Sequence, residues 1–123
     1  MKNKKLALEE LAKDCQIWGQ YCNSKGETCA VGRLAQLAGI DNNRLMDLGT
    51  TAISPGAMNL LQKEILESLS KVRKAIYDKF GLTERELAGI QLNNDHYKQN
   101  REERIKGVLL VVKRIKEIGR AHV

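Results

Sequence analysis

The chain has 123 residues, of which 42% are hydrophobic and 29% are charged, with a single proline and a formal charge of +6 at pH 7. This length and composition predict one globular domain and exclude a disordered or low-complexity chain. The longest apolar run, Gly107 to Val112, is far shorter than the roughly 20 residues that cross a bilayer. The basic start, residues 1–5, is followed by acidic residues and no cleavage site, so we expect a cytoplasmic protein with no membrane contact.

The basic excess is concentrated at the two ends of the chain. Residues 1–5 contain three lysines and no acid, and residues 98–120 contain eight basic and three acidic side chains. Residues 6–97, in contrast, contain ten basic and twelve acidic side chains. Positive charge favours nucleic acid or an acidic protein partner, so we expect the two ends to make such contacts.

The first predicted helix covers about residues 5–18, where apolar residues recur at three- and four-residue spacing. Gly19 ends this helix, and the polar stretch 20–27 is predicted to be a loop. The residues expected on the buried face of this helix are Leu8, Leu11, Ala12, Cys15 and Trp18.

Two short helices are predicted next. Thr28 is the expected N-cap of a helix over about residues 29–38, and Gly39 fits the left-handed position that closes it. Asp41 is the expected N-cap of a helix over residues 42–48, which Gly49 ends.

One long central helix is predicted from Ser54-Pro55 to about Phe80, because serine caps a helix and proline fits its first position. Gly81 supplies the stop. Its expected apolar stripe consists of Met58, Leu61, Ile65, Leu69, Val72 and Ile76.

The last third of the chain predicts two more helices. Thr83 and Glu86 form a capping box for a short helix that Asn93-Asn94 ends. Asn100 begins a final helix over about residues 101–118, which Gly119 closes. No segment alternates with the two-residue period of a strand, so we predict an all-α fold of five or six helices in a single domain.

Residues 31–50 (VGRLAQLAGIDNNRLMDLGT) resemble a helix-turn-helix DNA-binding motif. Such a motif needs a small residue where its helices cross and a glycine at the turn, and Ala35 and Gly39 stand at these positions. The resemblance implies that Asn42, Asn43 and Arg44 open a recognition helix, since asparagine suits adenine and arginine suits guanine. The two acidic residues of the segment, Asp41 and Asp47, would face phosphates unfavourably.

A second resemblance rests on three separated motifs. They are Trp18-Gly19, the Cys-x-x-Gly-x-Leu segment that begins at Cys29 and contains Gly32, and residues 90–95 (IQLNND) leading to Arg104 and Val108. Taken together over about residues 15–110, the chain resembles a group of small, uncharacterised helical proteins of bacteria and their phages. The resemblance implies a helical fold, and it carries no activity. It also makes residues 29–38 a core helix whose Gly32 admits a close neighbour.

From the residue types themselves, Asn94 and Asp95 are expected to cap a helix or to satisfy buried amides near Cys29. Cys15, Cys22 and Cys29 are spaced by seven and lack the close ligand pairs of a zinc site, so we interpret them as reduced, buried side chains. A thiol enzyme that uses Cys29 with His96 as its base lacks an orienting group. We therefore expect no enzyme, no metal and no cofactor.

The final predicted helix carries a basic ridge opposite its apolar stripe. Lys106, Lys113 and Arg120 repeat by seven, with Arg114 and Lys116 on either side. This ridge is interpreted either as a solvated face or as a surface that contacts phosphates or an acidic protein. Aromatic residues make up 4% of the chain, which disfavours a single-strand binder that works by base stacking.

These features predict a non-enzymatic protein of phage or mobile-element type that binds a macromolecular partner. The first hypothesis is double-stranded DNA, read by residues 42–44 with phosphate contacts from the two ends of the chain. The alternative is an inhibitor or regulator of a host or defence complex, such as an anti-CRISPR protein, which docks on an acidic protein surface through the basic helix. Many helix-turn-helix proteins are homodimers, but no spare apolar stripe identifies a dimer interface here.

Overall fold

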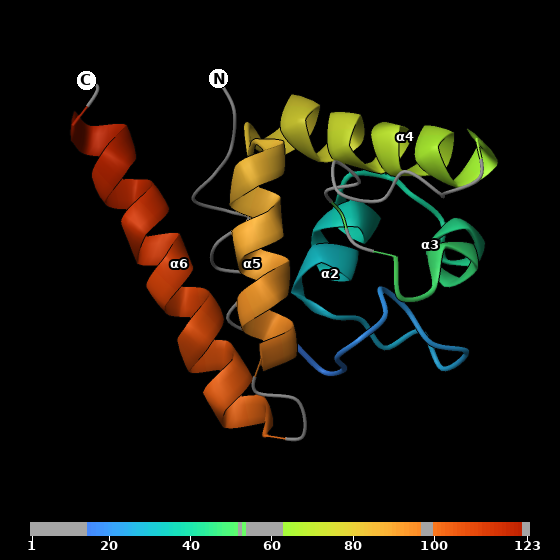
Figure 1. The fold of residues 1–123 in the computed structure, drawn as a ribbon, viewed down its shortest axis with the longest axis horizontal. Helices are drawn as coiled ribbons and strands as arrows, with labels where there is room; N and C mark the ends of the chain where they lie inside the picture. The colour runs from blue at the N-terminus through green and yellow to red at the C-terminus, as the bar shows by residue number, and fades with distance from the viewer. Residues whose placement is uncertain (1–14, 52, 54–62, 97–99, 122–123) are drawn as a thin grey trace.

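The computed structural model describes residues 15–51, 53, 63–96 and 100–121, with the side chains of residues 116–121 excepted. Within these ranges the chain forms five helices: α2 (Ala30–Leu37), α3 (Asn42–Leu48), α4 (Lys63–Phe80), α5 (Glu84–His96) and α6 (Arg101–Ala121). The described residues contain no strand, and their one isolated bridge joins Cys22 to Thr28. The prediction of an all-α fold is confirmed (Figure 1).

The predicted first helix is wrong over residues 15–18, the part of it that the structure describes. Residues 15–18 are not helical, Cys15 has a φ of 74°, and Trp18 is 41% exposed. The backbone makes tertiary hydrogen bonds instead, because the amides of Gln16 and Ile17 both donate to the carbonyl oxygen of Thr28. The remaining residues of that prediction, including Leu8, Leu11 and Ala12, lie outside the described residues.

The two short helices form where they were predicted, with one change of cap. Cys29 is the N-cap of α2 in place of Thr28, and its sulfur accepts a hydrogen bond from the amide of Gly32 at 3.3 Å. Thr28 is buried instead. The turn follows the prediction, with Gly39 at a φ of 93° and the Asp41 carboxylate accepting from the first turn of α3.

The long central helix is described from Lys63 onward, so Ser54-Pro55, Met58 and Leu61 lie outside the described residues. Leu69, Val72 and Ile76 of its predicted stripe are fully buried. Gly81 has a φ of 74° directly after α4, as expected for a glycine stop.

The capping box at the start of α5 is confirmed by reciprocal hydrogen bonds between Thr83 and Glu86, at 2.8 and 3.2 Å. The predicted stop at Asn93-Asn94 is wrong, since α5 continues to His96. The side chain of Asn94 points into the protein and bonds other segments, so it does not compete with its own helix. The predicted end of the last helix at Gly119 is also wrong, since α6 runs to Ala121.

The helices are arranged around a core that α2, α4, α5 and α6 share. α5 and α6 lie side by side and antiparallel, α2 contacts α5 and α4, and α3 contacts α4 (Figure 1). α6 and α3 therefore stand at opposite ends of the molecule. The core residues include Leu34 of α2, Ile76 of α4, Ile90 of α5 and Val108 of α6, all fully buried.

Candidate functional site

Asn94 joins three segments at the centre of the protein. Its side chain is fully buried, its Oδ1 accepts from the amide of Ala30 at 3.1 Å, and its Nδ2 donates to the carbonyl oxygen of Ile17 at 3.1 Å. The amide of Ala30 belongs to the first turn of α2, where it has no partner within the helix. The expectation that Asn94 satisfies a buried amide beside Cys29 is confirmed.

Asp95 and Arg104 extend this network to the segment before α2. The Oδ1 atom of Asp95 accepts from the amide of Gly19 at 3.0 Å. The guanidinium of Arg104 donates to the carbonyl oxygen of Cys15 through Nε and Nη2, at 3.0 and 2.8 Å, and to that of Gln16 at 3.0 Å. Burial lowers the pKa of Arg104 from its usual value, yet three charge-assisted contacts hold the group in place. Segments distant in the sequence are thereby tied into one structural unit.

Gly32 is required by a close approach of two backbone segments. A Cβ atom on Gly32 would lie 2.0 Å from the carbonyl oxygen of Tyr21, which is much shorter than a non-bonded contact between carbon and oxygen can be. The expectation that Gly32 admits a close neighbour is confirmed. Tyr21 is itself buried, donates to the carbonyl oxygen of Thr51 and accepts from Gln91 at 3.0 Å, and burial raises its pKa.

Cys29 lies in surroundings that disfavour a thiolate. Its side chain is buried, and desolvation, together with the nearby carboxylate of Asp95, raises its pKa to about 12. A nucleophilic cysteine needs the opposite shift. His96 stands exposed at the end of α5. Cys15, Cys22 and Cys29 are all buried free thiols, and the described residues contain no cluster of three potential ligands that could hold a metal.

Of the three residues predicted to read DNA bases, Asn42 and Arg44 bond other side chains of the protein, and Asn42 is nevertheless exposed. The Oδ1 of Asn42 accepts from Gln36 at 2.7 Å, and Arg44 is half-buried with its Nη1 3.3 Å from the hydroxyl of Ser68 on α4. Asn43 is exposed, as are the flanking acids Asp41 and Asp47. The exposed part of α3 therefore presents amide and carboxylate groups.

The described part of the basic ridge is exposed but lies far from α3. Lys106, Lys113 and Arg114 are exposed on α6, with Lys106 paired to Glu103 at 3.4 Å. The side chains of Lys116 and Arg120 lie outside the described residues. Because α6 and α3 occupy opposite ends of the molecule (Figure 1), the structure does not bring the ridge and residues 42–44 together on one surface.

Three exposed leucines lie on α5 and α6, and sequence reasoning missed them. Leu92 of α5 is 69% exposed, and Leu110 and Leu109 of α6 are 60% and 38% exposed. A signal was present, because the apolar run from Gly107 to Val112 is too long for one buried helix face. At least part of that run had to face solvent.

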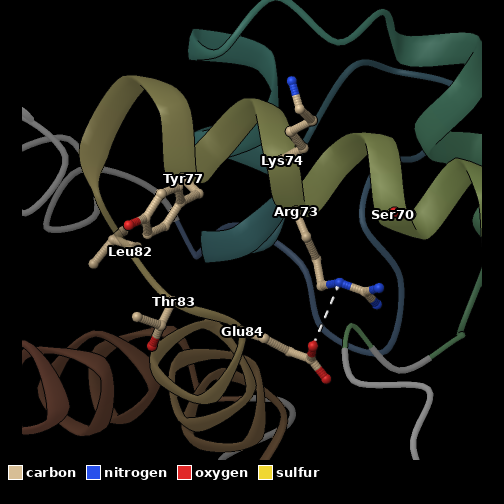
Figure 2. Close-up of a pocket in the computed structure, with 7 residues that line it drawn as sticks. All are labelled: Ser70, Arg73, Lys74, Tyr77, Leu82, Thr83 and Glu84. Carbon is tan, nitrogen blue, oxygen red and sulfur yellow. Dashed lines mark ion pairs between the residues drawn. The ribbon is translucent and has the colours of Figure 1, made fainter.

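Two open pockets lie on the described surface. One, of about 550 Å³, lies beside the buried network and is lined by Gln16, Ile17, Trp18, Gln20 and Arg104. The other, of about 370 Å³, lies between α4 and the start of α5 (Figure 2). Its lining includes Arg73 and Glu84, which form an ion pair.

No described helix has the length and apolar character needed to cross a membrane. Comparison of the chain with protein families, curated proteins and solved structures found no match.

Proposed function

We propose that this protein is a non-enzymatic binding module that docks a partner protein through the outer face of α5 and α6. This outer face is defined by its exposed residues, Arg85, Leu92, Lys106, Leu109, Leu110, Lys113 and Arg114. The observation that carries the proposal is the exposure of Leu92 and Leu110 on adjacent helices. Single exposed leucines are common, but apolar side chains that gather on one face indicate an interaction surface.

Leu92 and Leu110 are exposed on neighbouring helices, close to the contact between α5 and α6. A Cβ on Gly89 would meet the side chain of Val111 at 3.6 Å, which identifies where α5 and α6 touch. Leu92 follows Gly89 by three residues and Leu110 precedes Val111, so both lie within about one helical turn of this contact. The helical period turns both leucines away from the buried side of the pair, where Ile90 lies.

The charges around these leucines define the chemistry of the partner. Arg85, Lys106, Lys113 and Arg114 are exposed on the outer face; its acidic neighbours are Glu102, which is exposed, and Glu103, which pairs with Lys106 at 3.4 Å. An apolar centre with a basic rim complements an apolar patch bordered by acidic side chains. A second copy of this chain would place one basic rim against another, so we propose a different protein as the partner.

Double-stranded DNA is the second proposal. The observation that favours it is the α2–turn–α3 arrangement, in which Ala35 is fully buried, Gly39 has a positive φ and Asp41 caps α3. These are the features that a helix-turn-helix motif requires. The exposed leucines of α6 have no role in phosphate contact, which is why this proposal ranks second.

The experiment compares retention of a partner by tagged variants in an extract of the native host. We expect a defined protein to be retained by the unaltered chain, to be lost with Leu110→Glu or Lys113→Glu, and to be kept by the control Leu66→Glu. Leu66 is an exposed leucine of α4, at 37%, and so matches the chemical change away from the outer face. Equal retention by Leu110→Glu and Leu66→Glu would refute docking through this face.

A gel-shift assay with duplex DNA separates the two proposals. Retardation that weakens steeply with added salt and is lost in Arg44→Gln, but kept in Leu110→Glu, would favour DNA binding through α3. The absence of retardation at low salt would remove DNA from consideration.

A further inference from the structure

The pocket between α4 and the start of α5 contains a guanidinium group that the fold uses only in part. The side chain of Arg73 is 20% exposed. Its Nη1 donates to the carbonyl oxygen of Ile53 at 3.0 Å, and its Nε lies 3.7 Å from Oε2 of Glu84. The longer separation is an ion pair without a hydrogen bond, since N–H···O bonds span about 2.7–3.2 Å. The remaining donors of this mostly buried arginine therefore have capacity for a ligand.

The walls of the pocket combine this charge with an apolar side. Figure 2 shows Arg73 and Glu84 directed toward each other, while the Tyr77 ring lies beside Leu82. Tyr77 is 49% exposed, so about half of its surface faces solvent. Lys74 points away from these groups in the same view and pairs with Asp78 at 3.4 Å. The pocket has a volume of about 370 Å³ and is open to solvent.

We propose that this pocket binds a small carboxylic acid that carries an apolar body. A carboxylate matches the planar fork of Arg73 with two parallel hydrogen bonds, a geometry that Glu84 does not reach at 3.7 Å. The apolar body packs against Tyr77 and Leu82. Glu84 has a side chain that is 48% exposed, and the ligand carboxylate competes with it for Arg73.

The charge count favours a carboxylate over a phosphate. Arg73 is the cation beside Glu84; Lys74 also lines the pocket, but its side chain points away from these two groups in Figure 2 and pairs with Asp78. A singly charged anion balances this cation, whereas a phosphate dianion close to Glu84 would carry uncompensated negative charge. This proposal does not depend on the docking proposal, because the residues that test it are not those of the outer face.

The test is a titration of the full chain with phenylacetate, followed by two-dimensional ¹⁵N–¹H correlation spectra. We expect saturable shifts at the amides of Ser70, Thr83 and Glu84 and at the side-chain Nε–H of Arg73. The neutral analogue 2-phenylethanol and inorganic phosphate should each bind at least about tenfold more weakly. Equal binding of 2-phenylethanol or of phosphate, or the absence of saturable shifts with millimolar phenylacetate, would overturn the proposal.

Two variants of the ion pair should change affinity in opposite directions. Arg73→Gln removes the fork and should weaken phenylacetate binding by about tenfold or more. Glu84→Gln removes the competing carboxylate and should tighten binding by about threefold or more. The control Lys71→Gln, which changes an exposed lysine of α4 that does not line the pocket, should stay within about twofold of the unaltered chain. If Arg73→Gln does not fold, as judged by its spectrum, Glu84→Gln decides alone: unchanged or weaker binding refutes the proposal.

Discussion

Replacement of Asn94 by alanine tests the buried network most directly, because one side chain holds two distant backbone groups. The change removes the 3.1 Å hydrogen bonds to the amide of Ala30 and to the carbonyl oxygen of Ile17. Ala30 is fully buried, so its amide should incur the upper part of the roughly 1–3 kcal/mol penalty of an unsatisfied group. Ile17 is half-buried and water can replace part of its bond, which leaves about 1 kcal/mol.

These two contributions predict that Asn94→Ala lowers the free energy of unfolding by about 3–4 kcal/mol. Urea unfolding followed by far-ultraviolet circular dichroism measures this loss, and an unchanged slope with denaturant shows that the two states remain comparable. Asn93→Ala is the matched control, because among the described residues the Asn93 side chain bonds the carbonyl oxygen of Gly89 in its own helix, at 2.9 Å. We expect this control to stay within about 0.5 kcal/mol. Similar losses for both variants would refute the bridging role of Asn94.

Two further predictions concern the helices that meet at this network. Gly32→Ala should destabilise the protein severely, because its Cβ would lie 2.0 Å from a backbone oxygen, whereas Gly89→Ala meets an ordinary 3.6 Å contact and should stabilise α5 by about 0.5–1 kcal/mol. Thermal unfolding measures both changes in stability. A shift of the unfolding midpoint in the same direction for both variants would contradict the contact geometry. The folded protein raises the pKa of Cys29 from 9.0 to about 12, so stability should be fully present below pH 9 and fall as the pH rises toward 12. Cys29→Ser keeps an N-cap oxygen and should reduce the loss of stability at alkaline pH. An unchanged dependence of stability on pH would show that the Cys29 thiol does not cause this loss.

Helix starts and stops could be predicted from the sequence where their partners are neighbours in the chain. The capping box of Thr83 and Glu86, the Asp41 cap and the glycine stops at Gly39 and Gly81 all form as expected. Each depends on backbone groups within about one turn, so local residue types are sufficient. The same reasoning failed at Cys15, whose carbonyl oxygen binds Arg104 at a separation of 89 residues.

The same distinction between local and long-range partners applies to the candidate site. Asn94 was expected to satisfy an amide near Cys29, yet its place inside α5 could not be predicted, because asparagine pairs commonly end helices. Its polar groups are bonded by Ala30 and Ile17, which only the packed structure brings to it. A buried partner thus overrides a local preference.

The amino-acid sequence by itself determined the helical class of this protein, the face of each long helix that is buried, and the excess of positive charge at its ends. These properties follow from periodicity and composition, which need no knowledge of the fold. Tertiary structure alone decided that α6 and α3 stand at opposite ends, that Leu92 and Leu110 are exposed on two neighbouring helices, and that Arg73 meets Glu84 at a pocket. Such relations depend on how helices cross and turn, because side-chain neighbours across helices are set by packing.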